Sequence, residues 1–191
     1  MKKNRGITMV ALVITIVVLL IIAGISIGAG NNAIKNSKLE NLKTNMLLIE
    51  VKAKEQIENA KFRLGTSFDK ATEEEKTNRV NTAKSEFTGE EIVDGNIFNN
   101  NIKITTEKIK EDNKKNIYYY KLSTQNLMDM GLKNVKSDEK DGYYIVKYDL
   151  YDLYDLYDLK KSRIEIYNTE GFEDEGNVVY SLTDIKQVRL K

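Results

Sequence analysis

The chain has 191 residues and a formal net charge of +1, from 30 basic and 29 acidic side chains. This length predicts one domain with an appendage at most, and the absence of a basic excess argues against nucleic acid as a main partner. The chain contains no His, Cys, Trp or Pro. It therefore lacks the commonest proton-transfer side chain, any thiol nucleophile, any disulfide and the usual zinc ligands.

The reactive side chains that remain form no known catalytic motif. Ser, Thr, Lys, Tyr and carboxylates are present, but no GxSxG, SxxK, P-loop or GxGxxG arrangement occurs. Tyr119, Tyr120, Glu139 and Asp141 are conceivable site residues, yet scattered polar residues usually lie on the surface. The sequence predicts no enzyme, no catalytic residue, no cofactor and no metal site.

The first thirty residues combine a basic head with a long apolar stretch. Met1–Gly6 carries Lys2, Lys3 and Arg5, and the 21 residues of Ile7–Ile27 carry no charge. In a helix this stretch would span about 30 Å, the thickness of the hydrocarbon core of a bilayer. The sequence predicts a membrane segment, with the N-terminus in the cytoplasm and the body outside.

Three fates of this segment are open. It could be a permanent signal anchor, or a signal peptide cut after small residues such as Gly28-Ala29-Gly30. It could also be cut after Gly6, which would leave the apolar helix attached to the exported body. A very short leader that ends in glycine favours the third fate.

The sequence KKNRG followed by ITMVALVITIVVLLIIAGISI resembles the class III leader of type IV pilins and type II secretion pseudopilins of Gram-positive type. This resemblance covers about the first thirty residues. It implies that a prepilin peptidase cuts after Gly6 and that Ile7 becomes the methylated N-terminus. It also implies assembly with other pilin-like subunits, first in the cell membrane and then in an extracellular filament.

One position departs from the family pattern. The family usually carries Glu at the fifth mature position, where it offsets the terminal amine of a neighbouring subunit, and this chain has Ala11. A carboxylate among apolar groups is costly unless it is paired, so its loss is easily tolerated. In the family this loss is often linked to a minor or tip subunit, although some Gram-positive relatives also lack the acid.

An amphipathic pattern follows the apolar stretch. Apolar residues recur every three or four positions, at Leu39, Leu42, Met46, Ile49, Ala53, Ile57, Ala60 and Leu64. This spacing predicts one helix over Ile7–Leu64, with Gly24, Gly28 and Gly30 as the points where it would bend or melt. A membrane anchor joined to an ordinary core helix would give the same pattern.

The remaining residues predict a mixed body. Thr72-Glu-Glu-Glu75 resembles a capping box, and Gly89–Asn101 reads as a loop. The expected strands are Ile102–Thr106, Asn116–Leu122, Tyr143–Tyr148, Arg163–Tyr167 and Gly176–Ser181, and the expected short helices are Ser123–Gly131 and Leu182–Val188. The fold class is therefore α+β, a long N-terminal helix packed on an antiparallel sheet.

The order YYYKLSTQNLMDMGL, DGYYIV, EIYNTEGF and NVVYSLTDI is similar to the C-terminal half of Gram-positive pilin-like proteins. The predicted organisation is a leader over 1–6, a transmembrane or assembly helix over 7–30, an amphipathic helix over 31–65 and an extracellular head over 66–191.

The triplet YDL occurs four times over residues 148–159. A period of three keeps no side chain on one face of either a strand or a helix. We expect an expanded hairpin loop or an extension of a hairpin. An adhesive surface, or weak Ca²⁺ attraction by Asp149, Asp152, Asp155 and Asp158, is the alternative, but the Gly and Glu of an EF-hand are missing.

The sequence therefore favours a structural subunit of a type IV pilus or of a type II secretion-like pseudopilus. Its expected partners are other pilin-like subunits, the prepilin peptidase, the assembly machinery and the membrane. One alternative is a single-pass membrane protein with an external ligand-binding domain. The other is a secreted binding module released after Gly30.

Overall fold

The computed structural model describes residues 9–65, 68–98, 102–150 and 164–188. Side chains are described over the same ranges except at residues 9–15, 17–32 and 69. The chain divides into two compact units, Met1–Asn41 and Leu42–Lys191. Each unit is described by itself.

The first element is one helix, α1 (Met9–Leu64), which confirms the predicted long helix over this range. The helix continues through Gly24, Gly28 and Gly30 without interruption. Each glycine costs about 1 kcal/mol relative to Ala, which is not enough to break a helix that is already propagating. The helix ends at Leu64, and the next residue is Gly65, whose φ of +72° suits a residue without a Cβ atom.

The second unit contains a five-stranded antiparallel sheet in which each strand pairs with the next one along the chain. Its strands are β1 (Glu90–Glu91), β2 (Ile117–Leu122), β3 (Tyr144–Asp149), β4 (Ile164–Asp174) and β5 (Asn177–Ser181). The helices are α2 (Glu73–Lys84), α3 (Thr106–Lys114), α4 (Thr124–Asp129) and α5 (Leu182–Ile185), with a short 3-10 helix η1 (Phe68–Lys70). The predicted α+β class is confirmed.

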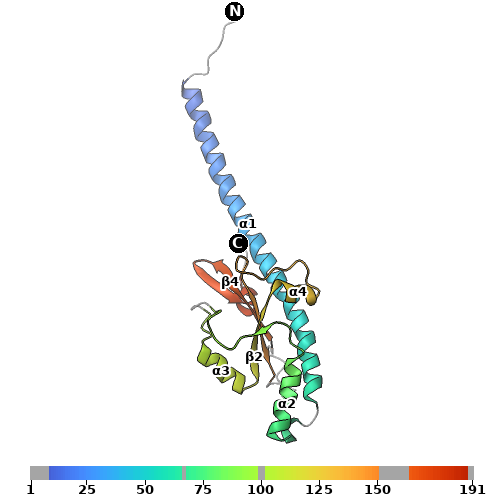
Figure 1. Cartoon of the computed structure of the whole chain (residues 1–191). Coiled ribbons are helices and arrows are strands. Elements are labelled where there is room, and N and C mark those ends of the chain that lie inside the picture. The colour runs from blue at the N-terminus through green and yellow to red at the C-terminus, as the bar shows by residue number, and fades with distance from the viewer. Residues whose placement is uncertain (1–8, 66–67, 99–101, 151–163, 189–191) are drawn as a thin grey trace, which may run out of the picture. The chain divides into compact units, whose positions relative to one another are not determined.

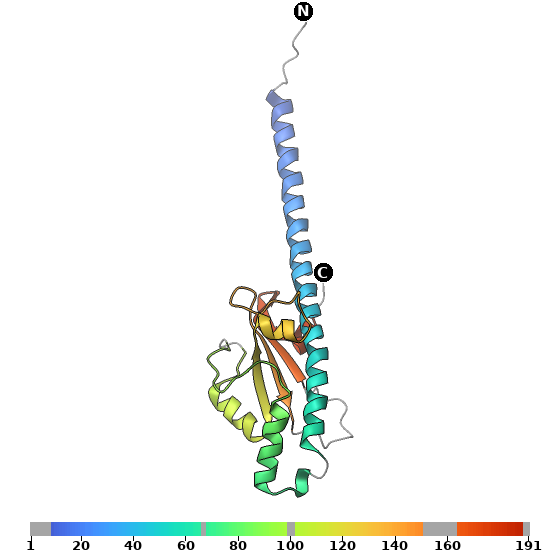
Figure 2. The ribbon, with the colours of Figure 1, turned by 45° about the vertical axis from the view of Figure 1, so that its right-hand side comes forward.

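Residues 42–64 of α1 pack along one face of the sheet (Figures 1 and 2). The predicted stripe is buried at Leu39, Met46, Ile49, Ala53, Ile57, Ala60 and Leu64, and only Leu42 is partly exposed. Polar contacts fix the register between helix and sheet. Asn45 donates to the Tyr144 hydroxyl at 3.4 Å, and the Tyr148 hydroxyl donates to Gln56 Oε1 at 2.5 Å.

Helix α3 covers the opposite face of the sheet (Figure 2). A second apolar cluster lies beneath it, formed by Ile92, Phe98, Ile109, Tyr119 and Ile145. The sheet is therefore buried on both faces, by apolar side chains of α1 on one and by α3 with its preceding loop on the other.

Several predicted elements are confirmed within a residue or two. The Thr72–Glu75 capping box starts α2, and Ser123 caps α4 through Asn126. Strands β2, β3 and β5 lie where the alternation of apolar residues placed them. In these segments, local capping and periodicity agree with the tertiary packing.

The predicted strand Ile102–Thr106 is wrong, because this segment leads into α3. Lys103 has a φ of +57°, which a regular strand does not accommodate, and the Thr105 side chain caps the helix by accepting from Lys108 N. Helix α3 was not predicted, because the short alternating sequence Ile-Lys-Ile at residues 102–104 is too brief to separate a strand from a helix.

Three other boundaries differ from prediction. The expected loop Gly89–Asn101 contains the two-residue strand β1. Strand β4 continues beyond Tyr167 to Asp174, because its pairing with β5 resumes at Phe172 after a register shift that includes Gly171 (φ +71°). Helix α5 ends at Ile185, short of the predicted Val188.

Among the described residues, no helix combines the length and apolarity that crossing a membrane requires. The side chains of the predicted membrane segment, apart from Ile16, lie outside the described residues. The membrane segment stays a prediction from the sequence.

Candidate functional site

The predicted processing junction, Gly6 and Ile7, lies outside the described residues. The same holds for residues 151–163, which include most of the YDL repeat. The start of the repeat is described, since Tyr148 and Asp149 end β3 and Leu150 is buried. Because β3 pairs with β4, the repeat lies in the connection between two adjacent strands.

The four conceivable site residues do not come together. Tyr119 and Tyr120 are neighbours on β2, so their side chains point to opposite faces of the sheet. Tyr120 packs edge-on against Phe87 and Tyr148, at centroid distances of 5.4 and 5.7 Å. Glu139 and Asp141 are exposed in the turn before β3. The four residues therefore form no common site.

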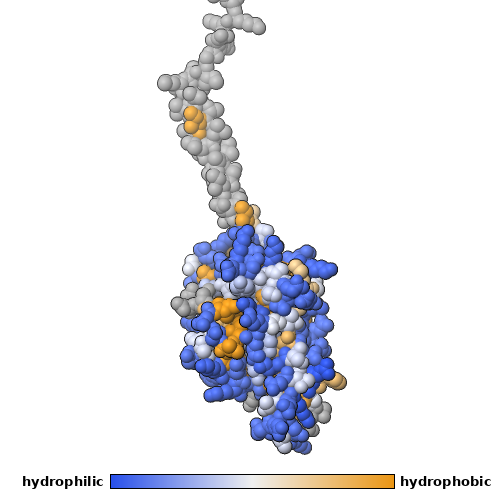
Figure 3. All heavy atoms as spheres, viewed as in Figure 1, coloured by the Kyte–Doolittle hydropathy of each residue, from blue (hydrophilic) through white to orange (hydrophobic). Residues whose placement is uncertain are grey.

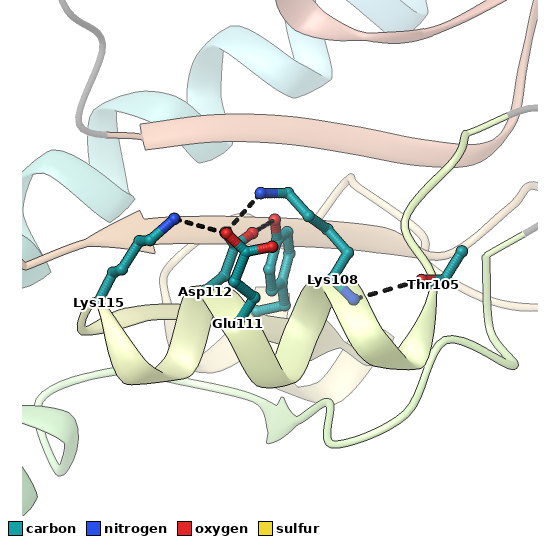
Figure 4. A network of polar contacts seen from close by, with 6 residues as sticks. Thr105, Lys108, Glu111, Asp112 and Lys115 are labelled. Carbon is teal, nitrogen blue, oxygen red and sulfur yellow. Dashed lines mark hydrogen bonds and ion pairs between the residues drawn. The ribbon is translucent and has the colours of Figure 1, made fainter.

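Tyr119 instead belongs to a polar network with α3 that sequence reasoning missed. Figure 4 labels the residues of this network on α3, Lys108 and Asp112. Its hydroxyl donates to Asp112 Oδ2 at 2.7 Å, and Lys108 Nζ contacts Asp112 Oδ1 at 2.8 Å. Asp112 is 2% exposed, although it lies on a short and strongly charged helix. Its spacing of three residues from the buried Ile109 is the sequence signal that could have revealed this inward orientation.

The electrostatics of the network favour a charged Asp112, a charged Lys108 and a neutral Tyr119. Burial by itself would raise the pKa of the Asp112 carboxyl, but the hydrogen bonds from Lys108 and Tyr119 outweigh it and hold that pKa below its usual value. The hydrogen bond to Asp112 raises the pKa of Lys108. Burial, reinforced by the Asp112 carboxylate, raises the pKa of Tyr119.

This network can hold α3 against the sheet, but it offers no open chemistry. Both carboxylate oxygens of Asp112 are occupied, and its side chain is almost fully buried. A general base or a metal ligand needs an oxygen that a substrate or an ion can reach. We therefore assign the network a structural role. Within the residues that the structure describes, no cluster of His, Cys, Asp and Glu is placed to hold a metal ion.

A small cavity of about 150 Å³ lies beside β1, where Glu90, Ile92, Ile97 and Lys121 contribute to its lining. Lys121 is already paired with Glu90 at 3.2 Å and lies 5.0 Å from the centre of the Tyr143 ring. Small-molecule sites usually enclose about 300 to 1,000 Å³. The face of the body seen in Figure 3 is mostly hydrophilic and is interrupted by an apolar area. A small ligand would find little enclosed space in this cavity.

Comparison with known proteins identified no relative of this chain. No family model matches the chain, and no curated protein or solved structure matches it significantly.

Sequence reasoning also missed a set of apolar residues on the exposed side of α1. Leu47, Leu48, Val51 and Phe62 all face solvent, although α1 already buries its other side. A helical projection of the printed sequence would have separated them from the buried stripe, because at 3.6 residues per turn they lie on the opposite side of the helix.

Proposed function

We propose that this chain is a structural subunit of a type IV pilus or of a type II secretion-like pseudopilus. In this proposal a prepilin peptidase cleaves after Gly6, Ile7 becomes the methylated N-terminus, and the subunit assembles through its apolar N-terminal helix. The chain would pass from the cell membrane into an extracellular filament. It would bind other pilin-like subunits and the assembly machinery, and it would catalyse no reaction.

The observation that carries the proposal is the chemistry along α1. The helix extends from Met9 to Leu64 as one element, and its first part is uncharged in sequence from Ile7 to Ile27. Its last part buries a stripe against its own antiparallel sheet. The apolar first part needs a non-aqueous environment, which a bilayer or a bundle of identical helices would supply. A short basic leader ending in Gly6 gives a route to that environment.

The alternative is a membrane-anchored extracellular domain that binds a ligand. The cavity beside β1 would be its candidate site, but its volume of about 150 Å³ and the pairing of Lys121 with Glu90 argue against it. The filament subunit is therefore the better supported function.

A matched pair of glycine substitutions tests the proposal. Gly6→Ala changes the predicted junction, whereas Gly24→Ala makes the same chemical change inside the apolar stretch. We expect Gly6→Ala to abolish shortening of the chain in cells that contain the peptidase, and Gly24→Ala to leave it intact. The readout is the mass of the mature chain in membrane and filament fractions. Equal processing of both variants would contradict a junction after Gly6.

A further inference from the structure

The two edges of the sheet differ in their chemistry. One edge is β1, which is only two residues long and consists of Glu90 and Glu91. The other edge is β5, which has five residues, no charged side chain and two valines. Sheets in natural proteins keep an edge from pairing with other chains by making it short, by charging it or by placing proline in it. Strand β1 has the first two of these features, and β5 has none of the three.

The outer side of β5 offers backbone groups to another strand. Glu175 and Gly176 join β4 to β5 with φ of +49° and +86°, the signs of a type I′ turn. In such a hairpin the two residues that flank the turn, Asp174 and Asn177, form a hydrogen-bonded pair. Val178 is the next residue, so its N–H and C=O point away from β4. Among the described residues, no strand lies on that side of β5.

The side chains of β5 are accessible as well. Val178 is 40% exposed, Asn177 is exposed, and the other three residues of the strand are partly exposed. Figure 1 shows the hairpin, in red beside the β4 label, at the margin of the body. When an extended peptide adds to such an edge, backbone hydrogen bonds supply affinity and side chains at alternate positions supply specificity. The β5 edge has both requirements in place before any partner arrives.

The surroundings of β5 carry charges of one sign. Residues 164–185 contain six acidic side chains and no basic one, although the whole chain has a net charge of +1. The nearest described cation along the chain, Lys186, is already paired with Glu50 at 3.1 Å. An incoming strand therefore meets an excess of negative charge, which favours a basic strand over an acidic one. The acidic residues are Glu165, Glu170, Glu173, Asp174, Glu175 and Asp184.

We infer that the open edge of β5 is a docking site for an extended, basic segment of a partner polypeptide, which adds to the sheet as a sixth strand. Val178 contacts an apolar side chain of this segment. Glu173, the register partner of Val178, and the adjacent Asp174 attract its lysine or arginine side chains. A second copy is a poor occupant, because pairing of two β5 edges would bring two acidic segments together. The inference is independent of leader cleavage and filament assembly.

Binding of a fluorescent peptide to the full chain in detergent micelles tests the inference. The probe is Lys-Val-Thr-Val-Lys-Val-Thr, blocked at both ends, which alternates polar and apolar positions as an added strand does. Two control peptides have the same length. One has Glu in place of each Lys, and the other carries a methyl group on every backbone nitrogen, which removes the donors that a strand needs. Fluorescence anisotropy at low and high salt gives the Kd of each peptide.

Matched variants separate the two edges of the sheet. Val178→Pro removes an N–H that points away from β4, where an edge strand tolerates proline, and Val178→Lys adds a charge that repels a basic strand. Val93→Lys makes the same charge change beside β1, where Val93 is 65% exposed. A double variant, Glu173→Gln with Asp174→Asn, removes two charges near the tip of the hairpin. Circular dichroism checks that each variant folds.

We expect the basic peptide to bind the wild type and Val93→Lys equally, and both Val178 variants to weaken binding at least about tenfold. The double variant should weaken binding about threefold or more and flatten its dependence on salt. These results, with weak binding of both control peptides, would support strand addition of a basic segment.

Four results would overturn the inference. They are no binding of the basic peptide to the wild type, equal binding of either control peptide, equal binding by the wild type and both Val178 variants, and wild-type dimers in sedimentation that Val178→Pro abolishes. The last result would assign the β5 edge to a second copy. None of these variants changes the leader, so the proposed function is tested separately by the mature N-terminus.

Discussion

The two parts of α1 form one helix with opposite chemical requirements. From Leu42 to Leu64, the sheet buries one stripe of apolar residues, and charged residues such as Lys54 and Glu58 face solvent together with a few apolar ones. From Ile7 to Ile27 the sequence has no charged face at all. An amphipathic helix can be satisfied by its own domain, whereas a helix that is apolar all round needs a partner or a membrane outside it. The proposed assembly role therefore rests on the segment Ile7–Ile27 and not on the segment that packs on the sheet.

The largest expected effect comes from a charge on the buried stripe. Ile57→Asp places a carboxylate where the side chain is 2% exposed, and we expect a loss of about 4 kcal/mol in unfolding free energy or failure to fold. Val51→Asp makes a similar change on the solvent-exposed side of the helix and should alter stability by no more than about 0.5 kcal/mol. Urea unfolding followed by circular dichroism measures both. Similar losses of unfolding free energy in the two variants would contradict the burial of one side of the helix and the exposure of the other.

A charge in the first part of α1 should act on membrane insertion and not on the fold of the body. Ile16→Arg is expected to disfavour insertion by about 3 kcal/mol. Ile34→Arg, beyond the apolar stretch, is the matched control and should not change insertion. The measurement is the fraction of chain that stays in the membrane pellet after alkaline extraction. An unchanged fraction for Ile16→Arg would argue against a membrane segment.

Helix α3 differs from the C-terminal part of α1, because a buried ionic contact helps to hold it on the sheet. Asp112→Asn removes the charge between Lys108 and Tyr119, and we expect a loss of about 1 to 3 kcal/mol at neutral pH. Glu111→Gln alters the neighbouring carboxylate, which is solvent-exposed and paired with Lys115, and should leave the unfolding free energy unchanged within error. Urea unfolding at pH 7 measures both variants, and equal losses would contradict a special role for the buried carboxylate.

The same contact predicts a pH dependence. The pKa of Asp112 is lower in the folded state than in the unfolded state, so the unfolded state binds the proton more readily. The stabilisation is therefore complete above the unfolded pKa of about 4 and is lost as the pH falls through the folded pKa. The stability gap between the wild type and Asp112→Asn should narrow below about pH 4. A gap that is constant from about pH 7 to about pH 2.5 would contradict the assigned contact.

The smallest expected effect concerns the polar contacts between α1 and the sheet. Tyr148→Phe removes the hydrogen bond to Gln56 and leaves the aromatic packing against Phe87, whose ring centroid lies 3.9 Å away. We expect a loss of about 1 kcal/mol in urea unfolding. Tyr143→Phe is the control, because Tyr143 is partly exposed and directly precedes β3. A much larger loss for Tyr148→Phe would mean that the apolar stripe is not the main attachment of α1.

Much of the fold could be predicted because its signals are local. The stripe of α1, the Thr72–Glu75 capping box and the Ser123 cap of α4 are properties of a few neighbouring residues. Helix α3 was missed because its start depends on the left-handed Lys103 and on packing against β2, which no short segment reveals. The extension of β4 through the Gly171 bulge depends in the same way on its partner strand.

The candidate functional residues also divide into those chosen from a local sequence pattern and those whose environment depends on tertiary packing. Gly6 and Ile7 stay a prediction, which rests on a short sequence alone and lies outside the described residues. The burial of Asp112 and the exposure of Phe62 were missed, although helical spacing relative to Ile109 and to the stripe of α1 hints at both, because their partners on the sheet are distant in the sequence. The YDL repeat is visible in the sequence, but its period of three specifies neither a strand nor a helix.

Mass spectrometry of the mature N-terminus, on chain recovered from membranes and from sheared extracellular material, separates a processed filament subunit from its two alternatives. We predict a chain that begins at Ile7 and carries one methyl group on its amine. An intact Met1 would favour a permanent membrane anchor, and a chain that begins at Asn31 would favour a released module. Either of these two results would contradict a processed filament subunit.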